Sequence, residues 1–310
     1  MIKYICFFLF IAFLGCDSEI SIIDDDSIHS FGGRGSIPGM FNKPRAAAIS
    51  PNGNIYVVDM TGRIQVFNSQ GKYLFLFNTP AIAKGKPTGL GFTPNGNLLV
   101  ADTHYHRILC YTPQGKQLLS FGKYGAEQPD FIYVTDVTAD EKYYYISQYG
   151  GALGKFDCIY KFDYEGNFVA SWGQGGNKPG EFDRPMSLAI DQYEKIYVAD
   201  ACNHRIQKFD KQGNLIAVWG KIGSDLGDLS YPYGVAVTSN ALYVSEFGNN
   251  RIQKFTLDGE AISYFGTSGR VIGMFANPWD VVITNSKLFI VDALNHRIQY
   301  FSQSIFNMEK

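Results

Sequence analysis

The chain has 310 residues and a formal net charge of −2, and its 27 Lys and Arg residues form no block. Proteins that track a phosphate backbone need clustered cations, so this balance argues against nucleic-acid binding. A 15% share of aromatic residues and 33 glycines instead favour many short strands joined by turns.

The N-terminal segment predicts export. Lys3 precedes an apolar run from Ile5 to Leu14, which is too short for an ordinary membrane span but suits a secretory signal. The run ends in Phe13-Leu14-Gly15-Cys16, which resembles a bacterial lipobox with Phe13 in place of the usual Leu. The resemblance implies a signal peptide over 1–15, lipidation of Cys16 and a polar tether over 16–26. We therefore expect a bacterial envelope protein, lipid-anchored to a membrane and periplasmic or surface-facing; the alternative is a soluble secreted form.

Six related segments make up most of the remaining chain. The clearest copy is Val198-Ala199-Asp200 followed by Arg205-Ile206-Gln207-Lys208-Phe209. The marker residues of the copies lie 43 to 52 residues apart: Asp59, Asp102, Gln148, Asp200, Glu246 and Asp292. This period is the length of a four-stranded propeller blade. The sequence therefore predicts an all-β, six-bladed β-propeller of four-stranded blades over 27–302, followed by a C-terminal tail over 303–310.

Ring closure has its own signature. The last unit, from Pro278 to Phe301, has room for only three strands, whereas residues 28–35 look like the ends of the fourth strands at 119–125 and 263–269. We therefore expect the N-terminal strand to complete the last blade and to pair an otherwise open sheet edge.

These repeats resemble the NHL family, in which a hydrophobic-Val-x-Asp stretch precedes Asn-x-Arg-Ile-x-x-Phe. Asp200 with residues 203–209 is the best match, and Asp292 with residues 295–298 is the next. The resemblance implies the propeller fold over nearly the whole mature chain. It implies no single activity, because NHL propellers include protein-binding modules, RNA-binding modules and a zinc-dependent amidating lyase.

Polar residues in the repeat loops allow two interpretations. His106, His204 and His296 occupy homologous loops, and three imidazoles suggest zinc. However, each directly precedes the repeat Arg, so we expect the pattern to follow from duplication. We expect the acid and Arg of each repeat to form structural ion pairs, namely Asp102/Arg107, Asp200/Arg205, Glu246/Arg251 and Asp292/Arg297. Cys110 and Cys158 fall in third strands, where packed thiols are expected rather than a disulfide.

One residue, usually Pro, opens the innermost strand of each blade. The residue directly after it is expected to face the channel. In the amidating lyase, metal-binding histidines stand at this place. Here the six positions hold Arg45, Thr88, Thr135, Met186, Tyr233 and Trp279. None is an imidazole, so we expect neither zinc nor another cofactor. The next residues supply two carboxylates, Asp136 and Asp280, which are few for the calcium site of a related lactonase and equally suit turn caps.

We therefore expect a non-catalytic, monomeric binding propeller that recognises a protein, peptide or glycan on its loop face. Arg45, Tyr233 and Trp279 have the composition of an interface hot spot, and the alternative is that both aromatics only plug the channel. Residues 149–156 form a Gly-rich extension that is either a tolerated insertion or a lid. The alternative function is a metal-dependent hydrolase or lyase that uses the channel carboxylates.

Overall fold

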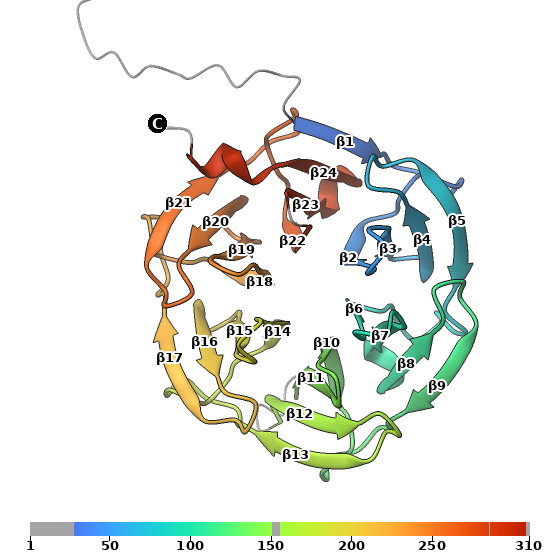
Figure 1. Cartoon of the computed structure of the whole chain (residues 1–310), viewed down its shortest axis with the longest axis vertical. Coiled ribbons are helices and arrows are strands. Elements are labelled where there is room, and N and C mark those ends of the chain that lie inside the picture. Colours follow the sequence, from blue (N-terminus) through green and yellow to red (C-terminus); the bar gives the residue numbers. More distant parts are fainter. Residues whose placement is uncertain (1–27, 151–155, 285, 308–310) are drawn as a thin grey trace, which may run out of the picture.

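The computed structural model describes residues 28–150, 156–284 and 286–307. Six four-stranded antiparallel sheets stand around a central channel (Figure 1). The predicted all-β, six-bladed propeller is thus confirmed. The predicted signal peptide and the whole predicted tether, including Cys16, lie outside the described residues. Within the described part of the chain, no helix is long and apolar enough to cross a bilayer.

Each of the first five blades uses four consecutive strands, ordered from the channel outward. The first three blades are β2 (Pro44–Ile49), β3 (Ile55–Asp59), β4 (Arg63–Phe67) and β5 (Tyr73–Asn78); β6 (Gly89–Phe92), β7 (Leu98–Asp102), β8 (Arg107–Tyr111) and β9 (Gln117–Phe121); and β10 (Tyr133–Ala139), β11 (Tyr143–Tyr149), β12 (Cys158–Asp163) and β13 (Phe168–Trp172). The next two are β14 (Pro185–Ile190), β15 (Ile196–Asp200), β16 (Arg205–Phe209) and β17 (Leu215–Trp219); and β18 (Pro232–Val237), β19 (Leu242–Glu246), β20 (Arg251–Phe255) and β21 (Ala261–Phe265).

The sixth blade joins the two ends of the described chain. It consists of β22 (Pro278–Ile283), β23 (Lys287–Asp292), β24 (Arg297–Ser302) and, outermost, β1 (Ile28–Gly32). β1 runs antiparallel to β24, with Ile28 opposite Phe301 and Gly32 opposite Arg297. The predicted closure is confirmed, and it pairs the edge that β24 would otherwise expose.

The residues after β24 pack on the ring. They form the short 3-10 helix η5 (Gln303–Asn307), and the Phe306 side chain is buried beside Tyr243 and Phe265, with ring centroids 5.3 and 6.5 Å away. The part of the C-terminal tail that the structure describes therefore adds to the core between the last two blades.

The sequence of each strand matches its depth in the blade. β15 is buried along its whole length, because neighbouring blades cover both of its faces, and it reads as an apolar run up to Asp200. The outermost strand β17 alternates between exposed and half-buried residues. Cys110 and Cys158 are buried free thiols on third strands, as expected.

Wedge residues in the blade-linking loops seal the gaps between blades. Phe41 is fully buried and packs against Phe67 at 5.5 Å. Gly32 has a φ of +97°, and a Cβ on it would lie 2.5 Å from the aromatic ring of Phe41. Glycine is therefore needed both for the backbone conformation and for the space.

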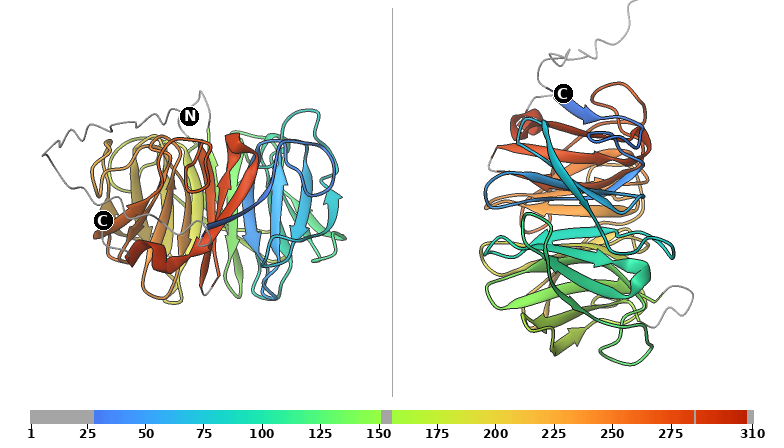
Figure 2. Two further views of the ribbon diagram at one scale, coloured as in Figure 1. Left: turned by 90° about the horizontal axis from the view of Figure 1, so that it is seen from above. Right: turned by 90° about the vertical axis from the view of Figure 1, so that its right-hand side faces the viewer.

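The ring has two different faces (Figure 2). The loop face carries the blade-linking loops and the loops between second and third strands, including the 3-10 helices η2 (Thr103–Tyr105) and η4 (Ala293–Asn295). The opposite turn face carries the tight hairpin turns, such as residues 50–54. The candidate functional residues gather where the channel meets the loop face.

Candidate binding site

Buried ion pairs fasten the loops between second and third strands on the loop face. In the fourth blade, Arg205 Nε donates to Asp200 Oδ2 over 2.7 Å, and the Asp200 side chain is fully buried. Equivalent pairs at 2.5 to 2.8 Å join Arg63 to Asp59, Arg107 to Asp102, Arg251 to Glu246 and Arg297 to Asp292. The predicted ion pairs are confirmed.

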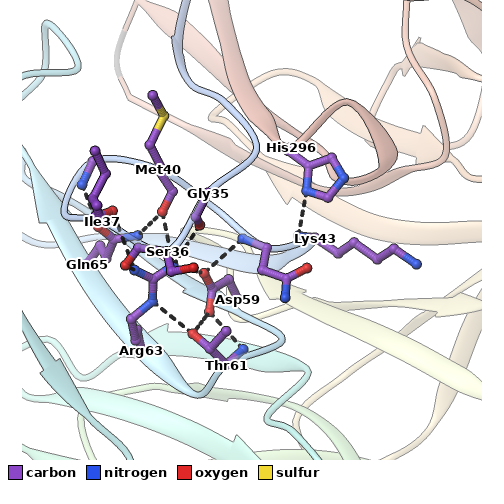
Figure 3. A network of polar contacts seen from close by, with 12 residues as sticks. Gly35, Ser36, Ile37, Met40, Lys43, Asp59, Thr61, Arg63, Gln65 and His296 are labelled. Atoms are coloured by element: carbon purple, nitrogen blue, oxygen red, sulfur yellow. Dashed lines mark hydrogen bonds and ion pairs between the residues drawn. The ribbon is translucent and has the colours of Figure 1, made fainter.

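The same guanidinium groups also hold the blade-linking loops. Figure 3 shows the first blade, where Arg63 donates to the carbonyl oxygens of Ser36 and Met40 over 2.5 and 3.1 Å while it pairs with Asp59. One planar cation thus satisfies a buried carboxylate and several loop carbonyls at once. Arg205, Arg251 and Arg297 hold loop carbonyls in the same way, whereas Arg107 Nη2 in the second blade is buried without a hydrogen-bond partner among the described residues.

Three loop histidines each tie their own blade to the next. His204 Nδ1 accepts a hydrogen bond from the Tyr231 backbone N–H over 3.1 Å. His296 Nδ1 accepts one from Lys43 N–H over 3.1 Å (Figure 3). His106 Nδ1 contacts the Ile132 carbonyl oxygen. Burial lowers the pKa of His204 and His296, which favours the neutral ring that such an accepting nitrogen requires. Across residues 28–150, 156–284 and 286–307, no group of three or more His, Cys, Asp or Glu residues is placed to hold a metal ion.

β-bulges explain how the inner-strand residues reach the channel. The pairing register shifts between Pro44 and Ala46 and at the same place in four other blades. The extra residue in these bulges is Arg45, Thr135, Met186, Tyr233 or Trp279. A bulge redirects the side chain of its extra residue, which is why these positions depart from ordinary strand alternation.

An aromatic cluster closes the channel near the loop face. Tyr233 stacks on Phe247 with centroids 4.5 Å apart, and Trp279 meets Tyr233 edge-on at 5.1 Å. Met186 packs beneath them, and both Met186 and Tyr233 are less than 10% exposed. Tyr233 therefore acts mainly as a plug.

Trp279 is also part of an open pocket. Its ring is half-buried, and the Arg45 guanidinium carbon lies 4.8 Å from the ring centroid. A pocket of about 240 Å³ opens beside this pair on the loop face, and its lining includes Lys43, Phe247 and Leu294. Trp279 thus belongs to the plug and also lines the pocket.

The predicted threonines have other partners. Thr88 Oγ1 donates to the Thr135 carbonyl over 2.9 Å, and Thr135 Oγ1 donates to the Pro185 carbonyl over 2.6 Å. These bonds link the second blade to the third and the third to the fourth. Thr88 also lines a cavity of about 10 Å³ beneath the plug, enough for one water molecule.

Asp136 and Asp280 lie below the plug and bind the next blade. Asp136 Oδ2 accepts from Ser187 Oγ and Leu188 N–H, both over 2.9 Å, and Asp280 Oδ2 accepts from Ala47 N–H over 3.0 Å. The Oδ1 atoms accept from the following backbone N–H groups. The two carboxyls thus hold neighbouring backbone N–H groups, and no third His, Cys, Asp or Glu among the described residues joins them in a possible metal site.

Burial perturbs both acids. It raises the pKa of Asp136 to about 7, and burial together with the charge of Asp136 raises the pKa of Asp280 to about 8. Neighbouring glycines give the carboxyls room, because a Cβ on Gly89 or Gly234 would lie 2.5 or 2.6 Å from an Asp Oδ1. On the turn-face side, the carboxyls line a cavity of about 190 Å³.

Sequence reasoning missed Arg184 and Phe247 and did not assign Tyr149 to the site. Arg184 precedes β14 at φ +60°, and its guanidinium carbon lies 5.0 Å from the Tyr149 ring centroid. A signal was present, because Arg184 and Lys43 are both cations directly before a strand-opening Pro. Of the Gly-rich extension, residues 151–155 lie outside the described residues.

These features define a six-bladed β-propeller with a plugged channel and a pocket at its loop-face mouth. The chain carries NHL repeats: the NHL repeat model matches residues 85–111, 182–209 and 229–255. No curated protein matches this chain in sequence.

Several solved propellers are similar in fold. Virginiamycin B lyase from Staphylococcus aureus is 14% identical with a TM-score of 0.60, covering 84% of this chain and 80% of that one. A gluconolactonase from Xanthomonas campestris is 15% identical with a TM-score of 0.63, covering 84% and 86%. A protein of unknown function from Bacteroides thetaiotaomicron is 15% identical with a TM-score of 0.62, covering 88% and 72%. At these identities the likeness establishes the fold alone.

Proposed function

We propose that this chain is a non-catalytic binding propeller that takes up a protein segment, peptide or glycan at its loop-face mouth. The observation that carries the proposal is the pocket of about 240 Å³, in which the Trp279 and Phe247 rings meet the cationic Lys43 and Arg45. No acidic residue occurs among the described residues that line it. An aromatic anchor beside a fixed cation is typical of interface hot spots.

The strand topology fixes the face at which a membrane tether would enter the ring. β1 begins at Ile28, opposite Phe301 near the turn face, and runs toward Arg297 at the loop face. A lipid on Cys16 would therefore reach the ring on the turn-face side, through a tether of up to roughly 35 Å. We propose that this monomeric protein is lipid-anchored in a bacterial envelope, with its loop face directed away from the membrane.

A hydrolase or lyase is the second candidate. The fold neighbours include proteins named as a lyase and a gluconolactonase, and an acid with a pKa near 7, such as Asp136, has the property that acid–base catalysis needs. We favour binding, because both carboxyls are tied to backbone N–H groups of the next blade. The loop-face pocket is lined by aromatic and cationic side chains and not by these acids.

The test is capture of envelope components by the wild-type protein and by Trp279→Ala. Truncation of an interface aromatic commonly costs about 2 kcal/mol, roughly a thirtyfold loss in affinity. Tyr193→Ala is the matched control, because Tyr193 is 62% exposed in a turn on the opposite face. Trp279→Ala should stay folded, with some loss of melting temperature because the indole contacts Tyr233 and Phe247, and should lose its captured component while the control keeps it. Equal capture by all three proteins would remove Trp279 from the site.

A further inference from the structure

Two arginines at the channel mouth form no ion pair within the part of the chain that the structure describes. Five other arginines form the loop ion pairs, and Arg34 and Arg270 are exposed. Arg45 and Arg184 are half-buried and lie over aromatic rings, 4.8 Å from the Trp279 centroid and 5.0 Å from the Tyr149 centroid. Arg184 Nε is buried and finds no hydrogen-bond acceptor in the described part of the chain.

The two arginines belong to opposite blades of the ring. Arg45 extends from β2 in the first blade, and Arg184 directly precedes β14 in the fourth (Figure 1). A chain of contacts around the plug joins them: Arg45 packs on Trp279, Trp279 meets Tyr233, and Tyr233 packs with Met186, two residues beyond Arg184. Burial, and to a smaller extent the charge of Arg184, lowers the pKa of Arg45, which agrees with this placement. The mouth therefore concentrates positive charge between aromatic walls.

Two acids lie near Arg184, but neither forms an ion pair with it among the described residues. Asp157 and Asp183 line a pocket of about 360 Å³ together with Arg184, and the Asp157 carboxylate accepts the Gly150 and Arg184 backbone N–H groups over 2.7 and 2.6 Å. Asp183 is an exposed neighbour on the same side of the mouth. A partly desolvated guanidinium without an anion is unfavourable, so these two groups are placed to gain from an anion that arrives with a ligand.

We propose that the mouth binds a ligand whose anionic group, a carboxylate or a phosphate, pairs with Arg45 and Arg184. The guanidinium fork matches either group bidentately. The apolar body of the ligand packs against Trp279 and Phe247, which line the adjoining pocket. This inference rests on the proposed binding function and specifies the chemistry of its ligand.

The test uses two pairs of small probes in calorimetric titrations. N-acetylphenylalanine is compared with its neutral amide, and phenyl phosphate is compared with phenol. At least one of the anions should bind the wild-type protein at least tenfold more tightly than its neutral analogue, and the stronger of the two identifies the anionic group. The inference would be overturned if neither anion bound more tightly than its neutral analogue.

Variants assign the binding to the two arginines. Arg45→Gln and Arg184→Gln should each weaken the preferred anion about tenfold, the usual effect of losing a hydrogen bond to a charged group. Arg270→Gln, which alters an exposed arginine of a blade-linking loop, should change the affinity for the anion by less than about twofold. Arg184→Asn serves as a second variant if Arg184→Gln fails to fold, because Asn277 holds the equivalent pre-proline position at φ +51°. Unchanged anion affinity in folded variants at both positions would refute the assignment.

The outcome also separates this inference from the proposed function. If Trp279→Ala loses the captured envelope component while Arg45→Gln and Arg184→Gln keep it at wild-type affinity, the mouth is a binding site but its ligand is not held through an anionic group. If the anion probes bind as stated but nothing is captured from the envelope, the anion site stands and the proposed macromolecular ligand falls.

Discussion

Arg205→Leu should destabilise the propeller by about 3–5 kcal/mol, because it removes one partner of a buried ion pair. Asp200 is fully buried and receives the Arg205 Nε–H over 2.7 Å. The other guanidinium nitrogens donate to the carbonyls of Asn177, Lys178 and Glu181 over 2.7 to 2.8 Å, so leucine would also free loop acceptors. In a domain of this size each kcal/mol moves the melting temperature by about 2–4 °C, so the expected drop is roughly 10 °C.

The loss from Arg205→Leu should depend on pH. Burial raises the pKa of Asp200 to about 6, above its value in the unfolded chain, so the folded state binds more protons and stability falls as pH rises from about 4 to 6. Arg205 opposes this shift, and its removal should raise the pKa of Asp200 further. The deficit of the variant should therefore be larger at pH 7.5 than at pH 5.

Thermal unfolding followed by circular dichroism at both pH values measures these effects. Arg270→Leu, at an exposed position, should change stability by less than about 0.5 kcal/mol. Asp200→Asn combined with Arg205→Leu should recover part of the loss at pH 7.5, because no charge is then left buried. A deficit below about 1 kcal/mol, or one that is equal at the two pH values, would refute the reasoning.

Three further predictions concern closure, the channel acids and the anchor. Deletion of β1 should lower the melting temperature of the whole ring by exposing the edge of β24, and an unchanged melting temperature would contradict the closure. Because burial and the Asp136 charge raise the pKa of Asp280 to about 8, the folded state binds extra protons, and the stability of the wild-type protein should fall between about pH 4 and 8. The melting temperature of Asp280→Asn should therefore compare more favourably with that of the wild type at pH 8 than at pH 5. An equal difference in melting temperature at both pH values would count against a buried titrating acid. Cys16→Ser should move the protein from the membrane fraction to the soluble fraction, whereas unchanged fractionation with an uncleaved N-terminus would indicate a signal anchor.

The architecture was predictable because each repeat carries its own structural instructions. Asp200 and Arg205 lie five residues apart, and their pairing is local to one loop, so the sequence pattern alone predicts it. Ring closure followed from the missing strand of the last unit. The sequence even predicts that Trp279 lies at the channel mouth, because it follows a strand-opening proline.

The binding site was only partly predictable because its contacts join distant blades. Arg45 meets Trp279 from the other end of the chain, and Phe247, which forms part of the plug, looks like an ordinary loop residue in the sequence. Thr88 and Thr135 share the expected position with Trp279, yet their hydroxyls satisfy carbonyls of the next blade. The backbone partners of Asp136 and Asp280 likewise have no sequence signature, since any residue supplies an N–H group.

Site-specific photocrosslinking in intact cells tests the proposed binding function most directly. A photoreactive amino acid at Leu294, which is 47% exposed and lines the loop-face pocket, is compared with one at Tyr193 on the turn face. Binding at the mouth predicts a discrete crosslinked product from position 294 that is absent from position 193 and is lost when Trp279→Ala is added. Crosslinks from position 193 alone, or equally from both positions and insensitive to Trp279→Ala, would contradict it.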